Sequence, residues 1–422
     1  MMKKLIRVLA LVLTLALLAG SALAENVNVR QFYSNEGDYL FYLRTLSDGR
    51  MLFGGSKQAD AGKDISRKWL LCLNEDRTVS WEYITPEAEA GTICSATEWP
   101  DGTIAVVYDM GDEDHEAPEG KNTLIRFYTP DGQATGREMA FADPAGVDEE
   151  TSHIVMYHTP AEGGQEQVMV MDWDGSRVFE LDTSGLGDEV LHFERIIGGV
   201  MLYGANAAQD GRARVKRVKG NNIEGETVWD LTLDHLWEDS DTARADDLVM
   251  TVDGGCAVLV NEAKTNDSGA VVWRSAVVKI DEEGRVQWTC KDETEKEDNN
   301  CRLYFASRKI VMYIPPDIKD DWDPDAPRIF RWFERSGEDL GTTELVLKPE
   351  DFPILQRFLV PEDGSEPAKA MIDYVSVYGE DTGLLVSADV CAYRPGEDGI
   401  QETIEGSDDT VVLTVPEPWR NK

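Results

Sequence analysis

The sequence of 422 residues is poor in positive charge. It has 41 lysines and arginines against 80 aspartates and glutamates, a formal net charge of −39 at pH 7. Attraction to phosphate supplies most non-specific affinity for nucleic acids, and this surface repels polyanions. Nucleic acid and anionic lipid headgroups are therefore not expected as partners. Hydrophobic residues make up 42% of the chain, enough to fill a core, so the acidity does not indicate disorder.

The sequence also lacks the linear motifs of common active sites. Its five histidines show neither an HExxH pattern nor a paired spacing for zinc, and no GxSxG element or glycine-rich phosphate loop occurs. Glycoside hydrolases and lyases can draw carboxylates from distant segments, so a carbohydrate-active enzyme stays open as an alternative without named catalytic residues. The mature chain shows no clean helical stripe, which favours an all-β fold.

One long hydrophobic run lies at the N-terminus. Lys3, Lys4 and Arg7 precede an uncharged run at residues 8–20, and Ala22-Leu23-Ala24 supplies the small residues that signal peptidase accepts. The run is too short to span the hydrocarbon thickness of a bilayer.

These features predict a signal peptide at residues 1–24 and a secreted protein with one domain at residues 25–422. After cleavage we expect no integral membrane segment. Ser21 stands where a lipoprotein needs cysteine, so lipidation is not expected.

A short motif recurs along the mature chain: an apolar strand, an acidic turn and a terminal tryptophan. LNEDRTVSW ends at Trp81 and IDEEGRVQW ends at Trp288, nine residues each and in register. Weaker copies, in which glycine or phenylalanine can replace the tryptophan, begin at Tyr128, Met171, Val218 and Phe333. A period of about 50 residues with two or more strands per unit is typical of a propeller blade.

A hairpin precedes most copies of the motif. Asp-Gly or Gly-Gly turns, which accept the positive φ of tight hairpins, separate two apolar runs. The second run is nearly continuously apolar, as in IAVVY, CAVLV and IVMYI. Strands that are buried on both faces have this composition, and the middle strands of a blade are sandwiched between neighbouring blades.

The count of units predicts how the ring closes. Six copies leave a C-terminal hairpin from Met371 and a strand at Asp409–Val415 without an outer strand, and the segment Asn26–Ser34 without a partner. Pairing of the two would complete a seventh blade and remove the exposed edges. We predict an all-β propeller of seven four-stranded blades, with six or eight as alternatives. Residues 351–370, which contain three prolines, are predicted to be a linker or insertion between blades six and seven.

The copies ending at Trp81 and Trp288 resemble the tryptophan-docking repeats of quinoprotein-like propellers, with their Ala-x-Asp-x-x-Thr-Gly-x-x-x-Trp pattern, and related repeats of secreted bacterial propellers. An indole at this position can bury a flat surface against the next blade and donate its N–H to a backbone carbonyl there. Quinoprotein dehydrogenases commonly have adjacent cysteines near their cofactor. None of the six cysteines is adjacent to another, so pyrroloquinoline quinone is not expected.

Cys290 and Cys301 bracket the polar connector KDETEKEDNN, so a disulfide could close a short loop there. The alternative is that both are free. Cys72, Cys94, Cys256 and Cys391 lie in apolar strands, where the expected role is that of a small buried hydrophobe.

Asp321, Asp323 and Asp325 alternate as in the first half of a calcium loop. Ala326 replaces the usual glycine and Trp332 replaces the final glutamate, so the alternative is a solvated acidic loop. Calcium is the only cofactor that the sequence suggests.

The connections between the second and third strands of each blade share one face of a propeller. Here they are long and varied, and two of them contain Trp273 and Trp322. Function tends to lie in loops held by a rigid scaffold. We therefore predict a binding protein for an extracellular protein or glycan, with these two tryptophans as ligand contacts; packing of each under its own loop is the alternative. The oligomeric state stays open.

Overall fold

The structure is a computed structural model. It describes residues 27–34, 38–57, 66–111, 121–147, 154–158, 167–172, 174, 176–182, 190–197, 200–207, 211–219, 226–266, 268–317, 323, 325–347, 355–359, 367–380, 383–395, 401–404, 407 and 409–419.

The described strands form seven antiparallel sheets, six of them from four consecutive strands. The first sheet contains β2 (Tyr39–Thr45), β3 (Met51–Lys57), β4 (Arg67–Leu73) and β5 (Val79–Ile84). The second contains β6 (Thr92–Glu98), β7 (Ile104–Asp109), β8 (Thr123–Tyr128) and β9 (Ala134–Phe141). The third contains β10 (Ala145–Val147), β11 (Ile154–His158), β12 (Gln167–Met171) and β13 (Arg177–Asp182).

The next three sheets repeat this order. The fourth sheet contains β14 (Val190–Ile197), β15 (Val200–Ala207), β16 (Arg212–Lys219) and β17 (Glu226–Thr232). The fifth contains β18 (Thr242–Met250), β19 (Cys256–Thr265), β20 (Val271–Ile280) and β21 (Val286–Lys291). The sixth contains β22 (Arg302–Ala306), β23 (Lys309–Ile314), β24 (Arg328–Phe333) and β25 (Asp339–Leu345).

The seventh sheet joins the two ends of the chain. It contains β26 (Lys369–Glu380), β27 (Gly383–Pro395), β28 (Gln401–Thr403), β29 (Asp409–Val415) and the N-terminal β1 (Val27–Asn28). β1 pairs with β29, with Val27 opposite Val412. The segment near Asn26 and the strand at Asp409–Val415 therefore pair as the sequence predicted.

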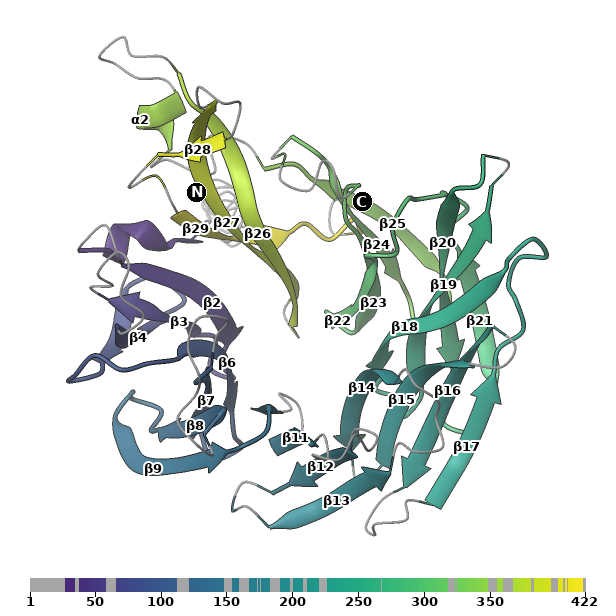
Figure 1. Ribbon diagram of the computed structural model, residues 1–422, viewed down its shortest axis with the longest axis horizontal. Helices are drawn as coiled ribbons and strands as arrows, with labels where there is room; N and C mark the ends of the chain where they lie inside the picture. Colours follow the sequence, from purple (N-terminus) through teal and green to yellow (C-terminus); the bar gives the residue numbers. More distant parts are fainter. Residues whose placement is uncertain are drawn as a thin grey trace, which may run out of the picture.

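Figure 1 shows the sheets arranged one after another around a common centre, with β6, β14, β18 and β22 on the inside and β9, β13, β17 and β21 on the outside. First strands contact the neighbouring sheet, for example β18 with β22 and β22 with β26. The chain is all-β: its described helices are the 3-10 turn η1 (Val29–Phe32) and the single helical turn α2 (Gln356–Leu359). No helix in the described residues is long and apolar enough to cross a membrane.

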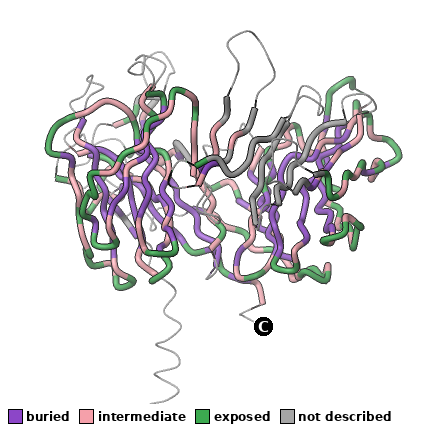
Figure 2. The backbone as a smooth tube through the Cα atoms, turned by 90° about the horizontal axis from the view of Figure 1, so that it is seen from below, coloured by how far each residue is buried: buried purple, intermediate pink, exposed green. Residues whose placement is uncertain are grey.

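Burial follows the position of a strand within its sheet. The second strands β3, β7, β19 and β23 are buried along almost their whole length, whereas the fourth strands β5, β9, β21 and β25 are largely exposed or half-buried. Figure 2 shows the buried strands inside the molecule and the exposed turns at its margins. The prediction of second strands sandwiched between neighbouring sheets is confirmed in these four sheets.

Three tryptophans on fourth strands join their sheet to the next one. Each indole Nε1 donates a hydrogen bond to a backbone carbonyl in the turn between the third and fourth strands of the following sheet: Trp81 to Pro130 at 3.1 Å, Trp229 to Glu282 at 3.1 Å and Trp288 to Arg335 at 2.7 Å. The predicted contact between the indole and a neighbouring carbonyl is confirmed at these positions.

A glycine in each receiving turn makes the contact possible. Gly132, Gly284 and Gly337 have φ values of +81°, +81° and +91°, which favour glycine. A Cβ atom at these positions would lie 2.3 to 2.8 Å from the docked indole. The glycine of one copy therefore receives the tryptophan of the previous copy, which explains why both residues recur together.

The C-terminal tail, residues 416–419, replaces one missing tryptophan. In the fifth sheet Trp288 lies opposite Lys279 on the neighbouring strand. The equivalent position in the sixth sheet is Gly341, which lies opposite Trp332. Trp419 packs edge-on against the buried Trp332 with ring centroids 5.1 Å apart. At Gly341 a Cβ atom would lie 3.8 Å from the tail residue Pro418. The tail thus covers the site that the sixth sheet leaves without an indole.

The predicted linker at residues 351–370 is only partly described. It contains α2, and Leu355 and Ala368 are buried in one hydrophobic cluster with strands of the seventh sheet. These described parts pack on the seventh sheet.

Candidate functional site

Trp273 lies in a strand, contrary to the prediction that it belongs to a long loop. β19 and β20 extend further than the apolar pattern indicated, and only residues 266–270 connect them. Trp273 pairs with Ala263 in this extension, and its backbone exchanges two hydrogen bonds with Lys296, at 2.8 and 2.9 Å. The prediction was wrong because polar residues such as Lys264 and Thr265 were assigned to a loop, although they stay in register at the end of a hairpin.

Trp273 is half-buried and stays at the end of the sheet from which the loops emerge. The guanidinium carbon of Arg244 lies 5.9 Å from its ring centroid. This pair presents an aromatic face and a cation beside the innermost strand β18. The other tryptophan predicted to contact a ligand, Trp322, lies outside the described residues, as do residues 58–65 and 112–120 of two further long loops.

Below this pair, Asp246 stands at a bulge of β18. Its Oδ2 accepts hydrogen bonds from the side-chain amides of Asn261 (2.7 Å) and Asn299 (3.0 Å), and Arg244 Nε lies 3.4 Å from its Oδ1. Ser275 donates to Asn261 Oδ1 at 2.6 Å and extends the network into β20. Asp246, Asn261 and Ser275 are buried, so their polar atoms need these partners.

Asp247, the next residue, bonds the fifth sheet to the sixth. Its Oδ2 accepts the backbone N–H of Leu303 in β22 at 2.8 Å, and its Oδ1 accepts that of Leu248 at 2.9 Å. Burial raises the pKa of Asp247 to about 6, with a smaller raising effect from Asp246, while the bonds to the two amides and the charge of Arg302 act in the opposite direction. A carboxyl group with such a pKa could exchange protons near neutral pH, but here both oxygens hold backbone amides.

The calcium prediction rests on three aspartates, and the structure describes two of them. Asp325 N donates to Asp323 Oδ1 at 2.9 Å, which shapes the turn, and Asp321 lies outside the described residues. Within the described part of the chain no cluster of three metal-ligating side chains occurs. The site at Asp321, Asp323 and Asp325 stays a prediction, which a calcium-dependent rise in melting temperature would support.

The structure does not join Cys290 to Cys301, and both are free thiols. Cys301 is buried, and Ser275 Oγ lies 3.5 Å from its sulfur. Cys290 is half-buried in the same hydrophobic cluster. Burial raises the pKa of both thiols and lowers their reactivity at neutral pH. The predicted bridge is not formed here, and a mass shift on reduction would test it in the exported protein.

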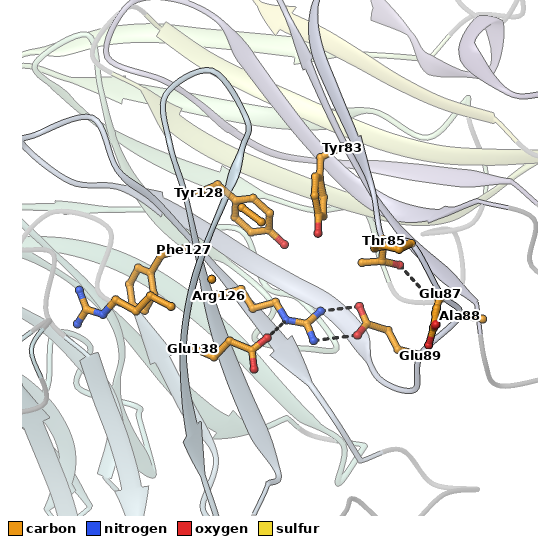
Figure 3. A pocket seen from close by; sticks show the side chains of 13 residues that line it. Tyr83, Thr85, Glu87, Ala88, Glu89, Arg126, Phe127, Tyr128 and Glu138 are labelled. Atoms are coloured by element: carbon orange, nitrogen blue, oxygen red, sulfur yellow. Dashed lines mark hydrogen bonds and ion pairs between the residues drawn. The ribbon is translucent and has the colours of Figure 1, made fainter.

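A pocket of about 450 Å³ lies between the outer strands of the first and second sheets (Figure 3). Arg126 of β8 lies at its centre. Its two terminal nitrogens donate to Glu89 at 2.5 and 2.8 Å, and its Nε donates to Glu138 of β9 at 2.7 Å. Burial favours the neutral form of Arg126, but these two carboxylates raise its pKa above the ordinary value. The guanidinium is therefore held in one orientation.

Tyrosine rings form a second wall of the pocket. Tyr83 packs edge-on against Tyr128 with centroids 5.0 Å apart, and Figure 3 shows both hydroxyls directed toward Arg126. Behind them, Tyr108 and Tyr128 share a hydrogen bond of 2.7 Å between their hydroxyls. Burial raises the pKa of Tyr108 to about 12. Burial, together with the electrostatic effect of the neighbouring Tyr108 hydroxyl and the hydrogen bond to it, raises the pKa of Tyr128. These phenols are neutral at any physiological pH.

Sequence reasoning did not find this pocket. Its walls come from residues 83–89 and 126–138, which meet only because two sheets pack side by side. One local signal was visible: the second copy of the motif has Gly136 at the position of the tryptophan. Gly136 has a φ of +76°, and a Cβ atom added there would meet no other atom within 4 Å. The missing side chain leaves the pocket open on that side.

No protein-family model matches the chain, and no curated protein matches it. Among solved structures, the polysaccharide lyase Uly1 is 11% identical over 90% of each chain, with a TM-score of 0.45. The β-propeller domain of the Trilobed protease from Pyrococcus furiosus is 11% identical over 75% of this chain and 85% of its own, with a TM-score of 0.39. A protein of unknown function from Dyadobacter fermentans is 11% identical over 93% and 99%, with a TM-score of 0.35. One of these neighbours is described as a β-propeller domain, and at these scores none of them carries an argument about activity.

Proposed function

We propose that the seven sheets are the blades of one propeller of the tryptophan-docking type, and that pairing of β1 with β29 closes its ring. The three indole bonds between consecutive sheets support the first part. The pairing of Val27 with Val412 supports the second. A closed ring has no unpaired sheet edge at its seam, which protects the molecule from aggregation.

We further propose that this propeller is exported and binds an extracellular protein or glycan through the face from which the long loops emerge. The half-buried Trp273 beside Arg244 is the observation that carries this proposal. Tryptophan and arginine are enriched where binding energy is concentrated, since both combine a large contact area with polar atoms. The strong negative charge favours partners that are neutral or basic.

The alternative, a carbohydrate-active hydrolase or lyase, needs carboxylates that can reach a substrate. On the innermost strand of the fifth sheet, Asp246 and Asp247 are both buried and bonded to neighbouring amides. Their geometry favours a structural role. Absence of turnover on a panel of neutral and acidic polysaccharides would agree with a binding protein, and sustained turnover would support the enzyme instead.

Protein partners of the mature chain are first identified by cross-linking in the producing culture, and glycan partners are identified on a glycan array. Binding of the identified partner to the mature chain is then measured. Replacement W273A should weaken binding of the identified partner roughly tenfold, as expected for an anchor residue. The matched control V252S lies in the β18–β19 turn at the opposite end of the same sheet, where Val252 is 64% exposed. We expect the control to leave binding unchanged. Equal binding by W273A and the unsubstituted chain would refute the assignment of this face.

A further inference from the structure

The pocket between the first and second sheets combines the three kinds of group that sugars use. Tyr83 offers the edge and face of an aromatic ring, Arg126 offers N–H donors, and Glu87 and Glu138 offer acceptor oxygens. We propose that this pocket binds a neutral saccharide, as one or two sugar units of a larger glycan. Its volume of about 450 Å³ lies within the usual range of small-ligand sites, which is about 300–1,000 Å³.

The polar groups of the pocket are held in place before any ligand arrives. Arg126 is fixed by two carboxylates that come from different sheets, Glu89 after β5 and Glu138 on β9. A ligand that meets fixed partners loses less free energy to the ordering of side chains. An ionised carboxylate can accept about four hydrogen bonds, so the bond from Arg126 leaves Glu138 free to accept sugar hydroxyls. The side chain of Glu138 is 50% exposed.

Gly136 lines the pocket at a position where other copies of the repeat have tryptophan. Trp81, Trp229 and Trp288 fill the equivalent position in the first, fourth and fifth sheets, whereas the second sheet has Gly136. The fourth strand β9 also departs from regular pairing between Arg126 and Tyr128. Gly136 has no side chain, so it leaves its part of the pocket lining open beside the polar walls.

Charge selects a neutral ligand over an acidic one. Arg126 already has two carboxylate partners, and the lining contains three glutamates against two arginines in a chain of net charge −39. A uronic acid would be repelled by this field. A cationic ligand would have to compete with Arg126 for Glu89 and Glu138. Hydroxyl groups need no such exchange, because they donate to the carboxylates and accept from the guanidinium together.

This inference rests on the proposed function, since it names a ligand class for an exported binding protein, but it concerns a different surface from Trp273. The probes are four neutral trisaccharides, cellotriose, maltotriose, mannotriose and xylotriose, with trigalacturonate as the acidic probe. Binding to the mature chain is measured by calorimetry and by saturation-transfer NMR. We expect at least one neutral probe to bind and trigalacturonate to bind more weakly or not at all.

The variants Y83A and E138Q should each weaken the binding of that probe, by about tenfold for the loss of the ring. The control E82Q changes a carboxylate on the same strand whose side chain points to the other face of the sheet and pairs with Lys57. It should bind as the unsubstituted chain does. If Y83A fails to fold, E138Q decides, because glutamine keeps the size of the side chain and removes the carboxylate.

Three results would overturn the inference: no binding of any neutral probe, equal binding by the pocket variants and E82Q, or tighter binding of trigalacturonate. Loss of partner binding in W273A, together with saccharide binding that is unchanged in the pocket variants, would support the loop face and refute the saccharide pocket. Loss of saccharide binding in the pocket variants alone would support the pocket and leave the loop face to its own test.

Discussion

Trp288 and Gly337 show how a residue in one sheet restricts which residue can stand in the next sheet. The indole of Trp288 donates to the carbonyl of Arg335 and covers Gly337, where a Cβ atom would lie 2.8 Å from the ring. A tryptophan at the end of one copy therefore requires a glycine in the turn of the next. Both residues were visible in the sequence as parts of a repeated pattern. The sequence did not show that they contact each other, because they lie in different sheets.

A double-mutant cycle tests this contact. W288A should lower the free energy of unfolding by about 2 kcal/mol, because a half-buried indole and its hydrogen bond are lost. G337A should also destabilise, through the clash with the indole and the positive φ. In the W288A background the clash is absent, so G337A should cost about 1 kcal/mol less there, as read from urea unfolding. Additive effects of the two substitutions would contradict the contact.

The raised pKa of Asp247 predicts how the free energy of unfolding depends on pH. Its pKa is about 6 in the folded chain, above the ordinary value of 3.8. The folded state therefore binds its proton more tightly than the unfolded state does. The stability that protonated Asp247 contributes is fully present below about pH 4 and is lost as the pH rises through 6. At pH 7 the buried charge destabilises the junction of the fifth and sixth sheets.

The variant D247N removes this titration. When the pH is lowered from 7.5 to 4.5, the free energy of unfolding of the unsubstituted chain should rise by about 1 to 3 kcal/mol relative to that of D247N. The comparison cancels the general effect of acid on so negative a protein, because both chains share it. A difference between the two chains that does not change with pH would show that Asp247 titrates normally.

At the scale of elements, the sequence predicted strands and turns better than connections. Gly284 and Trp288 carry local information, since a tight turn needs positive φ and a flat side chain must be buried. The hairpin around Trp273 was misassigned because its polar residues resemble a loop. Tyr83 and Glu138 meet in a pocket although 55 positions separate them in the sequence. No local pattern indicates such a meeting.

The C-terminal tail is an element whose role only the packing reveals. Trp419 contacts Trp332, and Thr343 of β25 donates to the carbonyl of Pro416 at 2.6 Å. Removal of residues 416–422 should expose β24 and β25. We expect faster amide hydrogen exchange in peptides from these strands, with peptides from β9 as the unchanged control. Unchanged exchange in β25 would show that the tail does not stabilise the sixth sheet.

At the scale of the whole molecule, seven sheets around a common centre depend on a seam where the chain ends meet. β1 has two residues, so few bonds hold the N-terminal strand to β29. Val27 and Val412 nevertheless belong to one buried cluster with residues of the first sheet. The hydrophobic contacts of this seam join the seventh sheet to the first. The proposed closure of the ring, and with it a rigid support for the proposed ligand surfaces, depends on these contacts.

Disulfide trapping at this seam tests the central claim most directly. In the double variant V27C/V412C the two residues are cross-strand partners on one face, so their Cα atoms lie within reach of a disulfide. In the control V27C/V411C the second cysteine is one position out of register and points to the opposite face. The account predicts that mild oxidation links residues 27 and 412 in nearly all molecules and links the control pair rarely, as read by peptide mass spectrometry. Free, alkylatable thiols in V27C/V412C, or equal linkage of both pairs, would contradict the proposed closure of the ring.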